Sequence, residues 1–138
     1  MPKISRWFVF SALFYLILSL TAGALRLLPA HLIADLAFLN SFPAYLHLWT
    51  IGWLTQLIFG IAYWLLPVID RQQGRGPAWP MVASFLSLNV GLPLRAMTEA
   101  TQATAAAEST TLNLLALSAL LLWLSGILFA ASIWRRIK

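Results

Sequence analysis

The sequence contains no cysteine, and only 9% of its 138 residues are charged. The absence of cysteine excludes disulfides, thiolate metal sites, iron–sulfur clusters and covalently attached c-type haem. Scarce charge together with a hydrophobic content of 61% is typical of an integral membrane protein. The net charge is +5, but the cations are dispersed around apolar stretches, so no nucleic-acid partner is expected.

Four apolar stretches are long enough to cross a bilayer, which takes about 20 residues. They cover approximately residues 7–28, 41–69, 78–97 and 111–134. We therefore predict a single all-α domain over residues 1–138, an integral membrane four-helix transmembrane bundle. The first stretch lacks a clear small-residue cleavage site, so we expect it to be retained. The segment 98–110, rich in Thr and Ala, either extends a helix or forms a loop.

Positive charge is unevenly divided between the two sides of these spans. One side carries Lys3, Arg6, Arg71, Arg75, Arg135, Arg136 and Lys138. The other side carries only Arg26 and Arg95. Because cytoplasmic loops are enriched in Lys and Arg, both termini are expected in the cytoplasm. We expect a multi-pass protein of the bacterial plasma (inner) membrane whose second span runs from the outside inward.

The second span contains an ionisable residue, His47, and no charged residue between it and Pro67. Ionisable groups are costly in a bilayer, so His47 is a candidate functional residue. A neutral imidazole is the commonest metal ligand. The alternative is that His47 only forms a hydrogen bond to a neighbouring helix.

The two faces of the second span differ in character. At 100° per residue, Ile51 and Leu54 share the face of His47, which suits a flat apolar ligand such as haem. The opposite face carries Gly52, Gln56, Gly60 and Tyr63. We expect this second face to pack against another helix, with Gln56 forming a hydrogen bond across it.

The segment from His47 to Pro67 resembles helix II of the haem-copper oxidase subunit I superfamily, and is most similar to shorter bacterial proteins related to that subunit. The resemblance rests on the histidine, on the glycine and aromatic pattern that follows, and on the proline at the inner end. It implies that His47 is an axial ligand of a non-covalent haem b on the outer side. Subunit I proteins have many more spans, so the resemblance is strong over only part of this chain.

Several residues are candidates for completing a haem site. The second axial ligand would be His31, or His47 of a second copy across a two-fold axis, or Met97 or Met81. A five-coordinate haem is a further alternative. Arg26 and Arg95 are expected to bind the propionates, unless they only extend towards the interface.

Local opening of the third span and the placement of the carboxylates also bear on function. Asn89 and Pro93 are expected to open the third span locally. All four carboxylates fall in predicted loops or at span ends, so a transporter or pump is not expected. They are Asp35, Asp70, Glu99 and Glu108.

The sequence therefore predicts a membrane haem b protein, acting as an electron-transfer or redox module in a homo-oligomer such as a homodimer, with a respiratory-chain redox partner. With two histidines, one chain cannot build a three-histidine copper centre, so no catalytic residue is assigned and enzymatic oxygen reduction is not expected. One alternative is a cofactor-free structural or assembly subunit of a respiratory complex. Another is a haem protein that responds to nitric oxide, carbon monoxide or oxygen.

Overall fold

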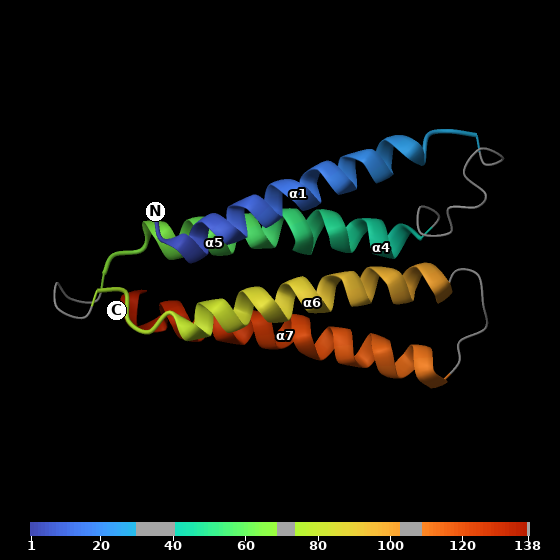
Figure 1. The fold of residues 1–138 in the computed structure, drawn as a ribbon. Coiled ribbons are helices and arrows are strands. Elements are labelled where there is room, and N and C mark those ends of the chain that lie inside the picture. The colour runs from blue at the N-terminus through green and yellow to red at the C-terminus, as the bar shows by residue number, and fades with distance from the viewer. Residues whose placement is uncertain (30–40, 69–73, 103–108, 138) are drawn as a thin grey trace.

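A computed structural model describes residues 1–29, 41–68, 74–102 and 109–137. These residues form the helices α1 (Lys3–Leu25), α4 (Phe42–His47), η1 (Leu48–Thr55), α5 (Gln56–Leu65), α6 (Trp79–Gln102) and α7 (Ser109–Ile137). The segments α4, η1 and α5 follow one another without a break and form one rod (Figure 1). The prediction of an all-α fold is confirmed for the described residues.

The described helices, α1, the rod of α4, η1 and α5, α6 and α7, lie lengthwise beside one another, and both termini lie at the same end of the bundle (Figure 1). The first pair is α1 against the rod of α4, η1 and α5, and the second pair is α6 against α7. Contacts between α4 and α6 join the two pairs at the end opposite to the termini. We call this the distal end, and the end that carries Lys3 and Ile137 the terminal end.

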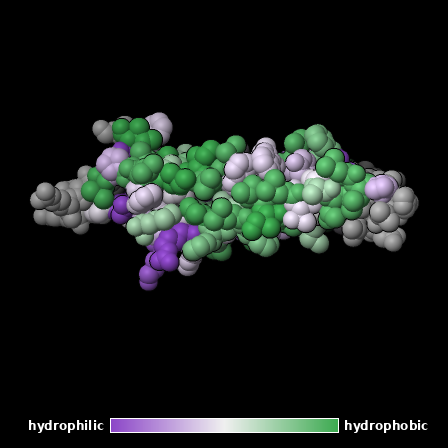
Figure 2. Space-filling view, turned by 90° about the horizontal axis from the view of Figure 1, so that it is seen from above, coloured by the Kyte–Doolittle hydropathy of each residue, from purple (hydrophilic) through white to green (hydrophobic). Residues whose placement is uncertain are grey.

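Within the described part of the chain, three helical segments are long and apolar enough to cross a membrane: Lys3–Leu25, Phe42–Leu65 and Ser109–Trp134. Apolar side chains cover much of the bundle surface, and hydrophilic atoms gather near the terminal end (Figure 2). The protein is therefore a membrane protein with transmembrane helices in contact with lipid. Helix α6 has 24 residues but is less apolar, since it includes Asn89, Arg95 and Glu99.

Helix α6 differs from the predicted third span in two ways. It continues past Met97 to Gln102, so the start of the Thr- and Ala-rich segment extends the helix. It also runs without interruption through Pro93. The expected local opening at Asn89 and Pro93 is therefore wrong, because Pro93 removes only its own i→i−4 hydrogen bond and α6 stays helical on both sides of it. The Asn89 side chain donates to the Phe85 carbonyl oxygen at 2.9 Å and to the Gln56 Oε1 atom of α5 at 3.1 Å.

The predicted packing face of the second rod is confirmed. A Cβ atom on Gly52 would lie 2.8 Å from Tyr15, and one on Gly60 would lie 2.9 Å from the Phe8 Cβ atom. Both positions are therefore close approaches of α1 that leave no room for a side chain. Gln56, which is fully buried, accepts a hydrogen bond from the Asn89 Nδ2 group at 3.1 Å.

The α6–α7 pair is also held by a close approach at a glycine and by side-chain hydrogen bonds between the helices. Ser84 and Ser125 are buried, and each hydroxyl donates to the other residue's backbone carbonyl oxygen at 2.9 Å. A Cβ atom on Gly91 would lie 2.9 Å from the Leu121 Cβ atom. Small residues and side-chain hydrogen bonds are the means by which helices associate in lipid, where apolar burial gives little driving force.

We expect Gly60→Ala to lower the free energy of unfolding by about 1–3 kcal/mol, because the added methyl group overlaps Phe8 and the Ser5 backbone oxygen. The matched control is Gly126→Ala in α7, where an added Cβ atom meets nothing within 4 Å. That control should be neutral or slightly stabilising. Unfolding in detergent, followed by circular dichroism, measures both; equal effects would contradict the packing described here.

Candidate functional site

His47 is the last residue of α4, and the first turns of this rod determine where it lies. Ser41 caps α4, accepting a hydrogen bond from the Ala44 N–H group at 3.3 Å. Pro43 occupies the first turn, where its missing N–H group costs nothing. The His47 side chain is 28% exposed and lies near the distal end of the bundle.

The imidazole of His47 lies against a carboxylate of α6. Its Nδ1 atom is 2.9 Å from the Glu99 Oε2 atom and 2.9 Å from the Pro43 carbonyl oxygen. Both of these atoms are hydrogen-bond acceptors when Glu99 is ionised, so Nδ1 carries the proton and donates. Among the described residues, no hydrogen-bond partner of the His47 Nε2 atom is found.

The second oxygen of Glu99 is bound by Arg95. The Arg95 Nε group donates to the Glu99 Oε1 atom at 2.6 Å, one helical turn away. Arg95 Nη1 also lies 3.5 Å from the Leu115 carbonyl oxygen of α7. Glu99 is only 8% exposed, so its charge is held between two donors in a largely buried position. The three side chains, His47, Glu99 and Arg95, form what we call the distal cluster.

Glu99 lies in the last turn of α6, so its predicted place at a span end is confirmed, but its burial was not predicted. The helix continues past the apolar stretch, and Glu99 is only 8% exposed within it. The remaining carboxylates, Asp35, Asp70 and Glu108, lie outside the described residues. The spacing of Arg95 and Glu99, four residues apart, is the sequence signal for a helical ion pair that would have indicated this arrangement.

The helix that follows His47 is a π-helix, which the sequence did not suggest. Its hydrogen bonds run from residue i to i+5, so it turns by less than 100° per residue and shifts the expected alignment of side chains. Ile51 is partly buried and packs against the core cluster that contains Tyr15 and Leu92. Leu54 is 43% exposed. Their contact with a ligand stays a prediction.

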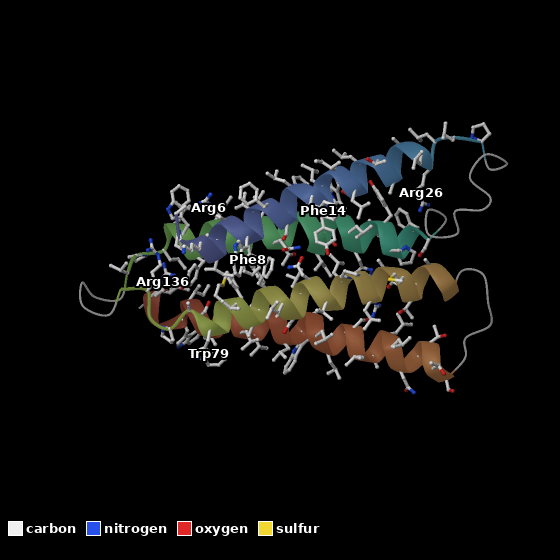
Figure 3. All side chains as sticks on the ribbon, viewed as in Figure 1. Arg6, Phe8, Phe14, Arg26, Trp79 and Arg136 are labelled. Carbon is white, nitrogen blue, oxygen red and sulfur yellow. The ribbon has the colours of Figure 1, made fainter. Side chains whose placement is uncertain are left out.

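The arginines predicted to bind propionates are both engaged. The Arg26 guanidinium lies over the rings of Phe42 and Tyr45, 5.5 Å and 5.8 Å from their centroids. Arg95 is bound to Glu99. Arg26 is placed at the distal end, opposite to Arg6 and Arg136 (Figure 3). Thus Arg95 is connected to His47 through Glu99, which both side chains contact.

The candidates for a second axial ligand are placed as follows. Met81 is fully buried in a cluster with Phe8, and it precedes Glu99 by 18 residues of α6, which corresponds to about 27 Å along the helix. It therefore lies far from His47. Met97 is on α6 near the distal end but is 68% exposed. His31 lies outside the described residues.

No group of three or more His, Asp or Glu residues that could hold a metal ion is found in the described part of the chain. Comparisons with protein-family models, with curated proteins and with solved structures find no match to this chain. The similarity of residues 47–67 to oxidase helix II therefore remains an expectation from the sequence.

We expect Glu99→Gln to lower the free energy of unfolding by about 1–3 kcal/mol, because Arg95 keeps its charge and loses its counter-ion. The double variant Arg95→Gln/Glu99→Gln should lose less than Glu99→Gln alone, since two neutral amides can still form a hydrogen bond. Detergent unfolding of the wild type, both single variants and the double variant gives the coupling. Additive losses would show that the two side chains do not interact.

Proposed function

We propose that this protein binds haem b through the Nε2 atom of His47 and serves as an electron-transfer module in the membrane. The observation that carries the proposal is the 2.9 Å contact between His47 Nδ1 and Glu99. Histidines that ligate metals usually donate their other ring N–H group to a carboxylate or a backbone carbonyl, which fixes the tautomer and the ring orientation. His47 has both kinds of acceptor, Glu99 and the Pro43 carbonyl.

The charge of the distal cluster supports this use of His47. Arg95 compensates the negative charge of Glu99, so a neutral His47 leaves the cluster with no net charge. A neutral imidazole protonated at Nδ1 presents its lone pair at Nε2, which is the form that ligates haem iron. The same buried carboxylate would raise the basicity of the imidazole as a ligand. When bound, haem b would supply a one-electron redox couple.

We propose further that the ligand site is completed in a homo-oligomer. His47 is partly exposed and has exposed apolar neighbours in Leu46 and Leu54, which are 40% and 43% exposed. A second copy related by a two-fold axis would place an equivalent histidine opposite the first and would cover this apolar surface. That arrangement needs one histidine per chain. His31 remains the alternative ligand.

The four-span arrangement belongs to the same proposal. Helix α6 is 24 residues long and packs along α7, whose apolar stretch can cross the membrane. If α6 also crosses, the excess of Lys and Arg at the terminal end places both termini in the cytoplasm of a bacterial inner membrane. The distal cluster would then lie in the outer half of the bilayer, where a respiratory redox partner could exchange electrons with it.

A second candidate function is a cofactor-free structural or assembly subunit. The specific observation in its favour is that the distal cluster already joins α4 to α6 through hydrogen bonds. In this function the ion pairs serve only to hold the two helix pairs together. The two functions differ in whether the His47 Nε2 atom has a ligand.

We expect the detergent-purified protein, expressed with ample haem, to show a sharp α-band after reduction with dithionite. His47→Ala should abolish this band, because it removes the iron ligand. The matched control is Thr50→Ala, an exposed residue in η1 whose hydroxyl only donates to the Leu46 carbonyl oxygen; it should leave the band unchanged. A colourless wild-type protein, or an unaltered band in His47→Ala, would contradict the proposal and leave the structural function.

Glu99→Gln should retain the α-band but weaken haem affinity by about 10–100-fold, because the carboxylate no longer orients His47. Its reduction potential should rise, since the imidazole becomes a less basic ligand for ferric iron. Val90→Ala, an exposed position on the same helix, is the control. Haem titration and redox potentiometry measure these effects. Unchanged affinity and potential in Glu99→Gln would show that Glu99 does not position the ligand.

A further inference from the structure

A groove of about 350 Å³ lies along α1 at the terminal end of the bundle. The residues that line it are Lys3, Arg6, Trp7 and Phe10. The last three follow Lys3 by three, four and seven residues, so all four side chains share one face of the helix. All four are exposed, Trp7 to 51% and Phe10 to 63%, so the groove is open to the surroundings of the protein. Two cations and two aromatic rings thus surround one hollow.

The Trp7 ring is held in place by a neighbouring helix. Its centroid lies 5.9 Å from that of Phe85 on α6, with the ring planes tilted by 49°. Phe85 in turn packs edge-on against Phe8, a fully buried core residue, with 5.1 Å between the centroids. The exposed part of the indole is therefore a preformed surface. A ligand that packs against a preformed surface pays little for ordering it.

The groove lies where the first span reaches the surface of the membrane. Helix α1 is long and apolar enough to cross a membrane, and Lys3 and Arg6 are in its first two turns. Trp79, at the start of α6, is 65% exposed and lies at the same end of the bundle as Arg6 (Figure 3). Tryptophan is enriched at the level of the lipid headgroups. The cations of the groove are therefore at headgroup level.

The order of the residues along α1 matches the order of the groups in a phospholipid. Lys3 is the first residue of the helix, and Phe10 lies about 10 Å further along the axis, at about 1.5 Å per residue. This direction leads into the hydrocarbon core of the bilayer. A phosphate group held by the cations would therefore leave its acyl chains beside the rings of Trp7 and Phe10.

We propose that this groove binds an anionic phospholipid. The Arg6 guanidinium matches phosphate oxygens through paired, charge-assisted hydrogen bonds, and Lys3 supplies a second, compact positive charge. A headgroup with net negative charge complements the two cations, whereas a zwitterionic headgroup would bring a further positive group beside them. A free phosphate would use the cations but leave both aromatic rings without a partner. The combination of charge and rings therefore favours a lipid.

The groove does not depend on the proposed haem function, since it lies at the opposite end of the bundle from His47. The test uses the full-length protein in detergent, titrated with phosphatidylglycerol or phosphatidylcholine and followed by native mass spectrometry. Arg6→Gln removes one positive charge from the groove, and Phe10→Ala removes one ring but no charge. The matched control is Arg75→Gln, which removes one positive charge from the segment before α6, at the same end but outside the groove lining.

We expect phosphatidylglycerol to bind more tightly than phosphatidylcholine. Arg6→Gln should weaken its binding about tenfold, as loss of a charge-assisted contact predicts, and Phe10→Ala about threefold, through loss of apolar contact. Arg75→Gln should have little effect. Circular dichroism checks that each variant is folded, which the exposure of Arg6 and Phe10 favours.

Four results would overturn the proposal. Equal affinity for the two lipids would show that the headgroup charge is not recognised. Equal weakening by Arg6→Gln and Arg75→Gln would indicate a diffuse attraction to the whole end of the bundle. Unchanged binding in Phe10→Ala would remove the contact with the acyl chains. Displacement of phosphatidylglycerol by inorganic phosphate would identify the groove as a site for free anions instead.

Discussion

The buried carboxylate of Glu99 is the constraint on which the arrangement at the distal end depends. One oxygen accepts from Arg95 and the other from His47, so a single side chain of α6 fixes both the end of α4 and a cation of its own helix. A carboxylate that is 8% exposed is stable only while both donors are in place. The orientation of the His47 ring, and with it any function of the Nε2 atom, therefore follows from Glu99.

Polar contacts at three levels hold the two helix pairs together. The distal cluster joins α4 to α6, the amide pair of Gln56 and Asn89 joins α5 to α6, and Arg136 joins α7 to the end of α5. Between these levels the helices approach closely at glycines and buried serines. In lipid, burial of apolar surface contributes little free energy to helix association, so hydrogen bonds and close packing determine which helix faces meet in the bundle. The exposed apolar side chains can then face lipid without contributing to the fold.

The features predicted correctly from the sequence are those that follow from regular helical periodicity. The packing positions Gly52 and Gly60, and the cross-helix hydrogen bond of Gln56, were expected because they repeat on one face of the second rod. The missed features depend on tertiary context. The burial of Glu99 depends on the packing of α6 against α4, and the π-helix after His47 leaves no clear mark in composition. Pro93 did not open α6, because a proline removes one backbone hydrogen bond and the helix continues on both sides of it.

The burial of Arg136 is another feature that could not be predicted from the sequence. Its predicted place among the positive charges on one side of the membrane agrees with its position at the terminal end. That prediction did not concern its burial. Its partners, such as Tyr63 and Pro67, are about 70 residues away along the chain, and they are backbone oxygens that any sequence would supply. Only the packing of α7 against α5 reveals that this arginine binds the end of another helix.

The most direct test of this account is the protonation of the two ring nitrogens of His47 in the protein without added haem. The chain has two histidines, so a His31→Gln variant labelled with ¹⁵N-histidine gives a single imidazole signal by nuclear magnetic resonance. The account predicts a proton on Nδ1, shifted by its bond to Glu99 and altered in Glu99→Gln, and an unprotonated Nε2. A proton on Nε2, with or without one on Nδ1, would contradict it.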